Sequence, residues 1–234
     1  MINSVFKRLP RSFYLRPTVT VARKLLGKFF IRKLNKLYLI GRIVETEAYC
    51  EGDPASHSYH GKTERNEVMF WKGGHLYVYF TYGMHFCANV VTRENGIGEA
   101  VLIRAIEPIE GIQTMITNRS RRKNSLVERW KNGILDDLTS GPARVCEAFG
   151  LTSKDNGIDL CGDKVWVAEI SNSQRRTIAN EMMIFSKKDF NKLQSQDWVN
   201  QKFSIMSSTR IGIRNGNEKK WRFYIKGNLW VSKS

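Results

Sequence analysis

Residues 28–49, KFFIRKLNKLYLIGRIVETEAY, decide how the chain folds. From Ile40 to Thr46 the side chains follow a period of two, which is typical of a β-strand. Asn35-Lys36 supplies turn residues between this segment and the apolar run before it. The stretch therefore predicts two antiparallel strands joined by a short turn, the second ending at Tyr49.

The chain beyond this hairpin contains more strand patterns. Residues 76–82 alternate Leu, Val and Phe with Tyr and Thr, and residues 86–92 run back after a turn at Gly83-Met84. The other expected strands are residues 100–106, 165–170 and 221–231.

Short helices are expected between the strands. They are residues 18–26, ended by Gly27; residues 108–118, opened by Pro108; and residues 142–149, with Ser140 as N-cap and Gly150 after the last turn. No regular alternation of strand and helix appears, so we expect an α+β fold with a curved, mainly antiparallel sheet flanked by short helices. A single domain over residues 1–234 is predicted, and a separate unit from Leu151 is the alternative.

The composition indicates a folded protein with a polyanionic partner. Of the 234 residues, 41% are hydrophobic, which is enough for a sizeable core, and 38 basic against 22 acidic residues give a net charge of +16. Such an excess favours nucleic acid, although a basic protein without that partner is the alternative. No apolar run is long enough to cross a bilayer. The four cysteines show no close pairing, and no signal peptide is evident, so we expect a reduced cytoplasmic protein.

Two carboxylates at the end of the second strand are candidates for chemistry. Glu45, Glu47 and Tyr49 are two residues apart, so a strand places them on one face. A general base beside a stacking aromatic is one interpretation, and an ordinary solvated strand face is the other.

A metal site was considered at His57 and His60, with Cys50 upstream. A zinc nucleobase deaminase would need the motifs H-x-E and P-C-x-x-C, and neither is present. We therefore expect no metal, and a single histidine lining a polar pocket is the better interpretation.

Aromatic residues and one arginine complete the candidate set. Tyr77 and Tyr79 lie on an expected strand, where tyrosines are usually half buried in the core. Tyr82 falls at the hairpin tip, where an aromatic side chain can insert into a base stack. Arg104 stands inside an apolar strand, so it needs a buried partner, for which Glu45 and Glu47 are candidates.

Taken together and in order, these segments resemble the alkyladenine (3-methyladenine) DNA glycosylase family, and the short N-terminus matches its bacterial form. The matching residues are Leu25-Leu26-Gly27-Lys28, 44–49, His57-Ser58, Arg65-Asn66, Met69-Phe70, 76–84, Asn89, 102–108, Ser140-Gly141-Pro142, Arg210-Ile211-Gly212, 222–227 and Trp230-Val231-Ser232.

The resemblance implies a catalytic role for two side chains and one backbone group. Glu47 matches the general base that activates the attacking water. Arg104 and the backbone carbonyl of Ile211 match the groups that hold this water in place.

The resemblance also implies how the damaged base is bound. Tyr49, His57 and Tyr79 match an aromatic pocket that sandwiches the flipped base, and Tyr82 matches the residue that intercalates into the gap. Asn89 matches a side chain whose bulk opposes the exocyclic amino group of guanine.

The function that follows is that of a monofunctional DNA glycosylase that starts base excision repair. It would act as a monomer on double-stranded DNA containing alkylated or deaminated purines, with no cofactor. The alternatives are a non-catalytic DNA- or RNA-binding protein with the same fold, and a glycosylase with lyase activity, which needs an amine nucleophile.

Three departures from the family pattern bear on substrate range and DNA affinity. His85 and Glu64 replace other residue types, the loop from Cys50 to His57 is shorter than in vertebrate members, and residues 174–207 match nothing in the family.

Overall fold

The computed structural model describes residues 5–81, 83–120, 137–170 and 203–232. Its central element is strand β3 (Leu37–Tyr49), which pairs antiparallel with β2 (Phe29–Leu34). Asn35 takes a positive φ of 54° between them, a conformation that asparagine tolerates better than most residues. The predicted hairpin is confirmed.

One antiparallel sheet contains all nine strands among the described residues, in the order β1-β7-β2-β3-β6-β5-β4, with β9 pairing to β3 and β8 to β9. The bounds are β1 Phe6–Arg8, β4 Leu76–Thr81, β5 His85–Val91, β6 Ala100–Glu110, β7 Val165–Ile170, β8 Ile205–Ser208 and β9 Arg222–Ile225. The sheet is not closed, and with the short helices it confirms the α+β prediction.

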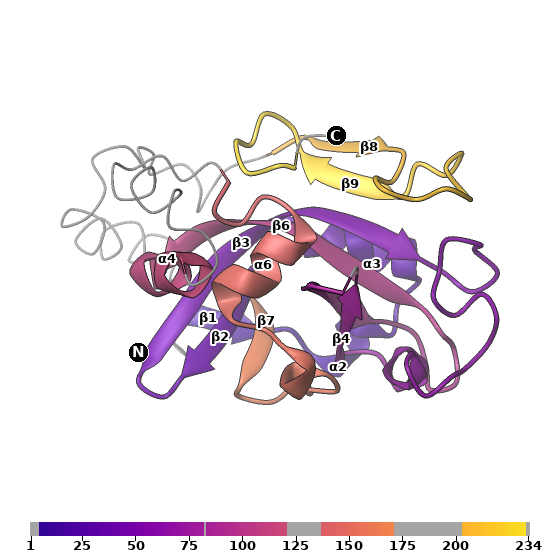
Figure 1. The fold of residues 1–234 in the computed structure, drawn as a ribbon, viewed down its shortest axis with the longest axis horizontal. Helices are drawn as coiled ribbons and strands as arrows, with labels where there is room; N and C mark the ends of the chain where they lie inside the picture. The colour runs from indigo at the N-terminus through magenta and orange to yellow at the C-terminus, as the bar shows by residue number, and fades with distance from the viewer. Residues whose placement is uncertain (1–4, 82, 121–136, 171–202, 233–234) are drawn as a thin grey trace.

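Short helices cover both faces of this sheet. Figure 1 shows α6 (Pro142–Phe149) in front of β3 and β6, and α3 (Thr18–Leu25) behind them. The Thr46 hydroxyl donates a 2.9 Å hydrogen bond to the Ala22 carbonyl of α3. On the other face, the Phe149 ring of α6 lies 5.2 Å from that of Phe30. The other helices in the described part of the chain are α2 (Arg11–Tyr14), α4 (Ile112–Ser120) and two 3₁₀ turns, Glu67–Phe70 and Ser153–Asp155.

Because both faces are covered, β3 is buried from Leu39 to Ala48. Glu45 and Glu47 are fully buried, so the alternative of a solvated strand face is wrong. The main apolar core is one cluster of side chains that includes residues of β2, β3, β6, α3 and α6.

Three local predictions are wrong. Pro108 lies inside β6 rather than in a helix, at a β-bulge in the pairing with β3. It also lies beyond the part of β6 that pairs with β5, so its missing N–H interrupts no hydrogen bonds to β5. Gly141, not Ser140, is the N-cap of α6, with no side-chain cap. The expected strand over residues 221–231 is only Arg222–Ile225.

Other boundaries agree closely with the patterns. Helix α3 ends before Gly27, which has a φ of 78°, and Gly150 closes α6 in the left-handed conformation. Within the described part of the chain, no helix combines the length and apolar character needed to span a membrane.

Candidate active site

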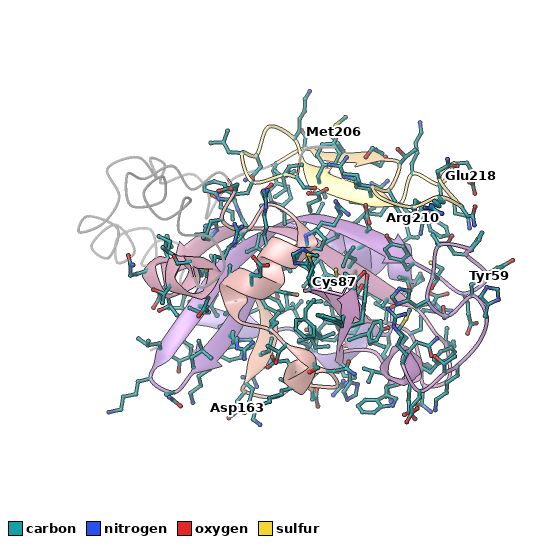
Figure 2. All side chains as sticks on the ribbon, viewed as in Figure 1. Tyr59, Cys87, Asp163, Met206, Arg210 and Glu218 are labelled. Atoms are coloured by element: carbon teal, nitrogen blue, oxygen red, sulfur yellow. The ribbon has the colours of Figure 1, made fainter. Side chains whose placement is uncertain are left out.

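A cavity of about 350 Å³ opens between the β4–β5 hairpin, the ends of β3 and β6, the start of α6 and the loop after Arg210. Its walls include most of the predicted site residues, which are Tyr49, His57, Tyr79, Asn89, Arg104 and Ile211. Figure 2 shows Cys87, another wall residue, near the middle of the molecule and Arg210 on the C-terminal segment.

Glu47 lies directly behind this cavity, and each of its three partners is a wall residue. Its Oε1 accepts a 2.8 Å hydrogen bond from the Ile211 backbone N–H and lies 3.3 Å from Arg104 Nη1. Its Oε2 accepts a 2.8 Å bond from the Tyr49 hydroxyl. A fully buried carboxylate is costly unless such donors compensate it, so the protein has built this position around a negative charge.

Tyr49 is a donor by necessity here. Burial and then the negative charge of Glu47 raise the pKa of Tyr49 above its ordinary value, so the hydroxyl keeps its proton. The ring also stacks with a cation, because the Arg210 guanidinium lies 4.8 Å from its centroid.

Glu45 has a different role from Glu47, although both lie on one strand face. Its Oε1 accepts from Arg104 Nε at 3.1 Å and from Arg222 Nε at 2.6 Å. Ser232 donates its hydroxyl to Oε1 at 2.9 Å and its backbone N–H to Oε2 at 2.7 Å. Glu45 therefore links Arg104 to Ser232. The expectation that Glu45 or Glu47 is the buried partner of Arg104 is confirmed, and the structure shows that both are.

Three rings form an aromatic wall on the opposite side of the cavity. The His57 and Tyr79 centroids are 4.3 Å apart, and those of Tyr77 and Tyr79 are 5.3 Å apart. His57 Nδ1 lies 3.0 Å from the Tyr77 hydroxyl, and burial raises the pKa of Tyr77 to about 12. The sequence predicts Tyr77 as half-buried core and does not indicate its contact with His57.

His57 is neutral at pH 7. Partial burial and then the positive charge of Arg65 lower the pKa of His57 below its ordinary value. Its ring remains accessible at the mouth of the cavity.

Asn89 and Cys87 line the β5 side. Asn89 is buried, and its amide group donates to the Tyr77 carbonyl at 3.1 Å, which fixes the side chain against the cavity. Cys87 is a free thiol, and burial raises its pKa, so it is a neutral wall residue.

The loop that carries Ile211 is fixed by an ion pair that the sequence did not reveal. Arg210 pairs with the fully buried Asp53 and donates to the Ala48 carbonyl at 3.0 Å and the Gly216 carbonyl at 2.9 Å. Burial alone would raise the pKa of Asp53, but the hydrogen bond and charge of Arg210 outweigh it and lower that pKa. The only sequence signal was the Arg210-Ile211-Gly212 match, which did not indicate a partner.

The β4–β5 hairpin carries exposed apolar side chains beside the cavity. Phe80 and Met84 are 48% and 56% exposed, respectively. Tyr82, the predicted intercalating residue, lies outside the described residues, and so does most of the segment 174–207. His85 lies 3.4 Å from Glu147 through Nδ1.

No group of three or more His, Cys, Asp or Glu side chains in the described ranges is arranged to hold a metal ion.

Comparison with known proteins gives a consistent result. A family model described as Methylpurine-DNA glycosylase matches residues 12–229. A protein of Francisella tularensis subsp. tularensis named "Putative 3-methyladenine DNA glycosylase" is 44% identical over 216 residues, covering 92% of this chain and 94% of its own. Proteins with the same name from Carboxydothermus hydrogenoformans and Clostridium acetobutylicum are 43% and 38% identical, over 96% of this chain and 98% and 97% of theirs.

Proposed function

Because the chain belongs to the methylpurine-DNA glycosylase family, we propose that it is a monofunctional DNA glycosylase acting on damaged purines in duplex DNA. It binds an alkylated or deaminated purine that has been flipped out of the helix and hydrolyses the N-glycosidic bond. The product is an abasic site, from which base excision repair proceeds.

The observation that carries the proposal is the placement of Glu47 behind the cavity, where each of its three partners among the described residues belongs to the cavity wall. Cleavage of a glycosidic bond passes through an oxocarbenium-like state, which a nearby carboxylate stabilises while it takes a proton from water. Arg104 and the Ile211 carbonyl orient this water. Hydrolysis of this kind needs no metal or organic cofactor.

The aromatic walls support a base-binding role. Tyr49, His57 and Tyr79 sandwich the flipped base, and stacking on an aromatic ring contributes about 1–3 kcal/mol per base. A purine methylated at a ring nitrogen carries positive charge, which the electron-rich faces of the two tyrosines attract. Asn89 excludes bases with the amino group of guanine, and Tyr82 fills the space left in the duplex.

The alternative of a non-catalytic nucleic-acid-binding protein is disfavoured because burying charged groups at this site costs free energy. Such a protein would need basic charge and aromatics but no fully buried Glu47 against Arg104. The lyase alternative requires an amine nucleophile, and no lysine is among the described residues of the cavity wall. Borohydride trapping of a covalent DNA adduct would revive it.

We further propose a single domain over residues 1–234, since β1 and β9 belong to one sheet. We also propose that the protein is a monomer and works in the bacterial cytoplasm.

The decisive experiment is excision under single-turnover conditions from duplexes carrying 3-methyladenine, hypoxanthine or ethenoadenine, comparing wild type with Glu47→Gln. We expect the variant to lose at least about 10²-fold in rate and to keep its affinity for the damaged duplex, because only the proton acceptor is removed. The exposed Glu94→Gln is the matched control and should keep full activity. Equal activity of Glu47→Gln and wild type would eliminate Glu47 as the base.

A further inference from the structure

A second hollow, of about 710 Å³, lies between β1, the segment around α2 and α3, and the start of β8. We call it the α3 groove. Its charged lining is almost entirely basic, with six cations and one anion, which are Lys7, Arg8, Arg16, Arg23, Lys24, Lys28 and Glu169.

Two of the cations already have partners within the protein. Lys28 forms a 2.6 Å ion pair with Glu169, and Arg8 donates to the Cys161 carbonyl at 3.1 Å. The other four side chains are exposed and have no carboxylate partner within the described ranges; they are Lys7, Arg16, Arg23 and Lys24. The groove therefore presents at least four positive charges available to a ligand.

The structural role of α3 does not account for these charges. Cations stabilise the C-terminal end of a helix, so Arg23 and Lys24 have such a role in the last turn. Arg16, however, precedes the N-terminal end of α3, where a positive charge is unfavourable to the helix dipole. Lys7 belongs to a different element, β1. Helix stabilisation explains two of the four at most.

The α3 groove is on the opposite side of the sheet from the candidate active site. Thr46 on β3 bonds to Ala22 of α3, whereas its neighbour Glu47 bonds to Arg104 and Ile211 of the cavity wall. None of the described residues that line the groove also lines the cavity.

We propose that the α3 groove binds the phosphate backbone of a second DNA segment while the active site holds the first. Among anions, a nucleic-acid backbone offers closely spaced charges along a line, and each neutralised phosphate releases condensed counterions. A second binding face allows the protein to pass from one duplex to another without dissociating into solution. This inference does not depend on the chemistry proposed for Glu47.

The test is a bridging assay. The protein is first bound to a biotinylated duplex with an abasic site on beads, and a fluorescent undamaged duplex is then added across a salt series. The groove variant is Lys7→Gln, Arg16→Gln, Arg23→Gln and Lys24→Gln together, and the charge-matched control is Lys33→Gln, Lys36→Gln, Lys154→Gln and Lys164→Gln, all exposed and outside the groove.

We expect wild type and control to retain the second duplex and the groove variant to retain at least about tenfold less. A plot of the logarithm of the association constant for the second duplex against the logarithm of the salt concentration should be less steep by about 3–4 in the groove variant. Each phosphate contact contributes about 0.9 to this slope, and four cations are removed. Single-turnover excision from the first duplex should be unchanged, which separates this result from a failure of the active site.

Arg16 and Arg23 lie over the Phe13 and Phe223 rings, so removing them can affect folding. The pair Lys7→Gln and Lys24→Gln avoids those contacts and should still reduce the slope by about 2. Equal bridging by groove and control variants would overturn the proposal. So would a groove variant that loses binding of a fluorescent polyglutamate peptide but keeps the second duplex, since this would identify an acidic protein segment as the occupant.

Discussion

At the scale of single residues, Glu45 and Glu47 show how two neighbouring carboxylates come to serve different purposes. All the groups bonded to Glu45 donate to it: two arginines and the Ser232 backbone N–H, none of which can accept, and the Ser232 hydroxyl. Glu47 has Tyr49 at Oε2, and a tyrosine hydroxyl can donate or accept. An amide is therefore tolerated at Glu47 and not at Glu45.

This difference predicts that the same substitution destabilises the fold by unequal amounts at the two positions. Glu45→Gln places an NH₂ group against donors and removes the charge that two buried arginines need, so we expect a loss of about 3–5 kcal/mol in the free energy of unfolding. Glu47→Gln keeps its oxygen toward Ile211 and its NH₂ toward Tyr49, and should lose distinctly less. Chemical denaturation of both variants measures this, and equal losses would mean that Glu47 is held as structurally as Glu45.

His57 predicts the acid side of the activity profile. Because its pKa is lowered, the ring is neutral at pH 7 and becomes charged only below its ordinary value of about 6.5. A charged His57 repels a cationic methylated purine, so excision of 3-methyladenine should decline as the pH falls through the lowered pKa of His57. His57→Gln should flatten this decline in a rate–pH series, whereas excision of neutral hypoxanthine should show a smaller effect of the substitution.

The same residues show what the sequence contained about the site. A period of two places Glu45, Glu47 and Tyr49 on one strand face, and this needs no knowledge of the rest of the chain. Their burial depends on α6 and on the C-terminal segment, which lie about a hundred or more residues away. Local spacing therefore left a solvated face open as an alternative that only the folded chain excludes.

At the scale of elements, the failures of prediction occur where tertiary pairing outweighs local signals. Pro108 favours a helix start by its own geometry, but pairing of β6 with β3 extends the strand to Glu110. The short β8 carries exposed apolar residues and no alternation strong enough to identify it, and among the described strands it pairs with β9 alone. Hairpins with clear turn residues, by contrast, were predicted to within a residue or two.

The loop after Arg210 carries the prediction of this scale. Arg210→Lys retains a charge for Asp53 but cannot keep the bonds to the Ala48 and Gly216 carbonyls, so the Ile211 N–H moves relative to Glu47. We expect about tenfold slower excision at saturating enzyme, with unchanged affinity for an undamaged duplex. A loss of binding without a change in rate would show that the loop contacts DNA rather than positioning the base.

Asp53 gives an independent check through pH. Its folded pKa is lowered, so the unfolded state binds the proton more readily, and the stability from the pair is present above about pH 4 and lost as the pH falls through the lowered value. Asp53→Asn should be less stable at neutral pH by about 3–5 kcal/mol, because Arg210 is left buried without its partner. Urea denaturation at pH 7 and pH 3 should show the gap between the two proteins narrowing on acidification.

At the scale of the whole molecule, the first and last described strands, β1 and β9, belong to one sheet, and residues near β9 complete the site. β9 pairs with the part of β3 that carries Glu45 and Glu47, and Ser232 then bonds to Glu45 across 187 positions of sequence. Arg222, which like Arg104 is bonded to Glu45, also donates to the Ser232 carbonyl at 3.0 Å. One network of ion pairs therefore holds both Ser232 and Arg104. Folding of the centre and closure of the chain end are therefore coupled.

That coupling is tested by two substitutions at Ser232. Ser232→Ala removes only the hydroxyl bonds to Glu45 and Arg104 and should cost about 1–3 kcal/mol of unfolding free energy. Ser232→Pro also removes the backbone N–H that Glu45 Oε2 accepts, leaving a buried oxygen without a donor, and should cost about 1–3 kcal/mol more. Since Arg104 belongs to this network, excision should be slowed by Ser232→Ala and slowed further by Ser232→Pro. If the proline variant were as stable and as active as wild type, the contacts of Ser232 would contribute nothing to stability or activity. The two arginines alone would then hold Glu45.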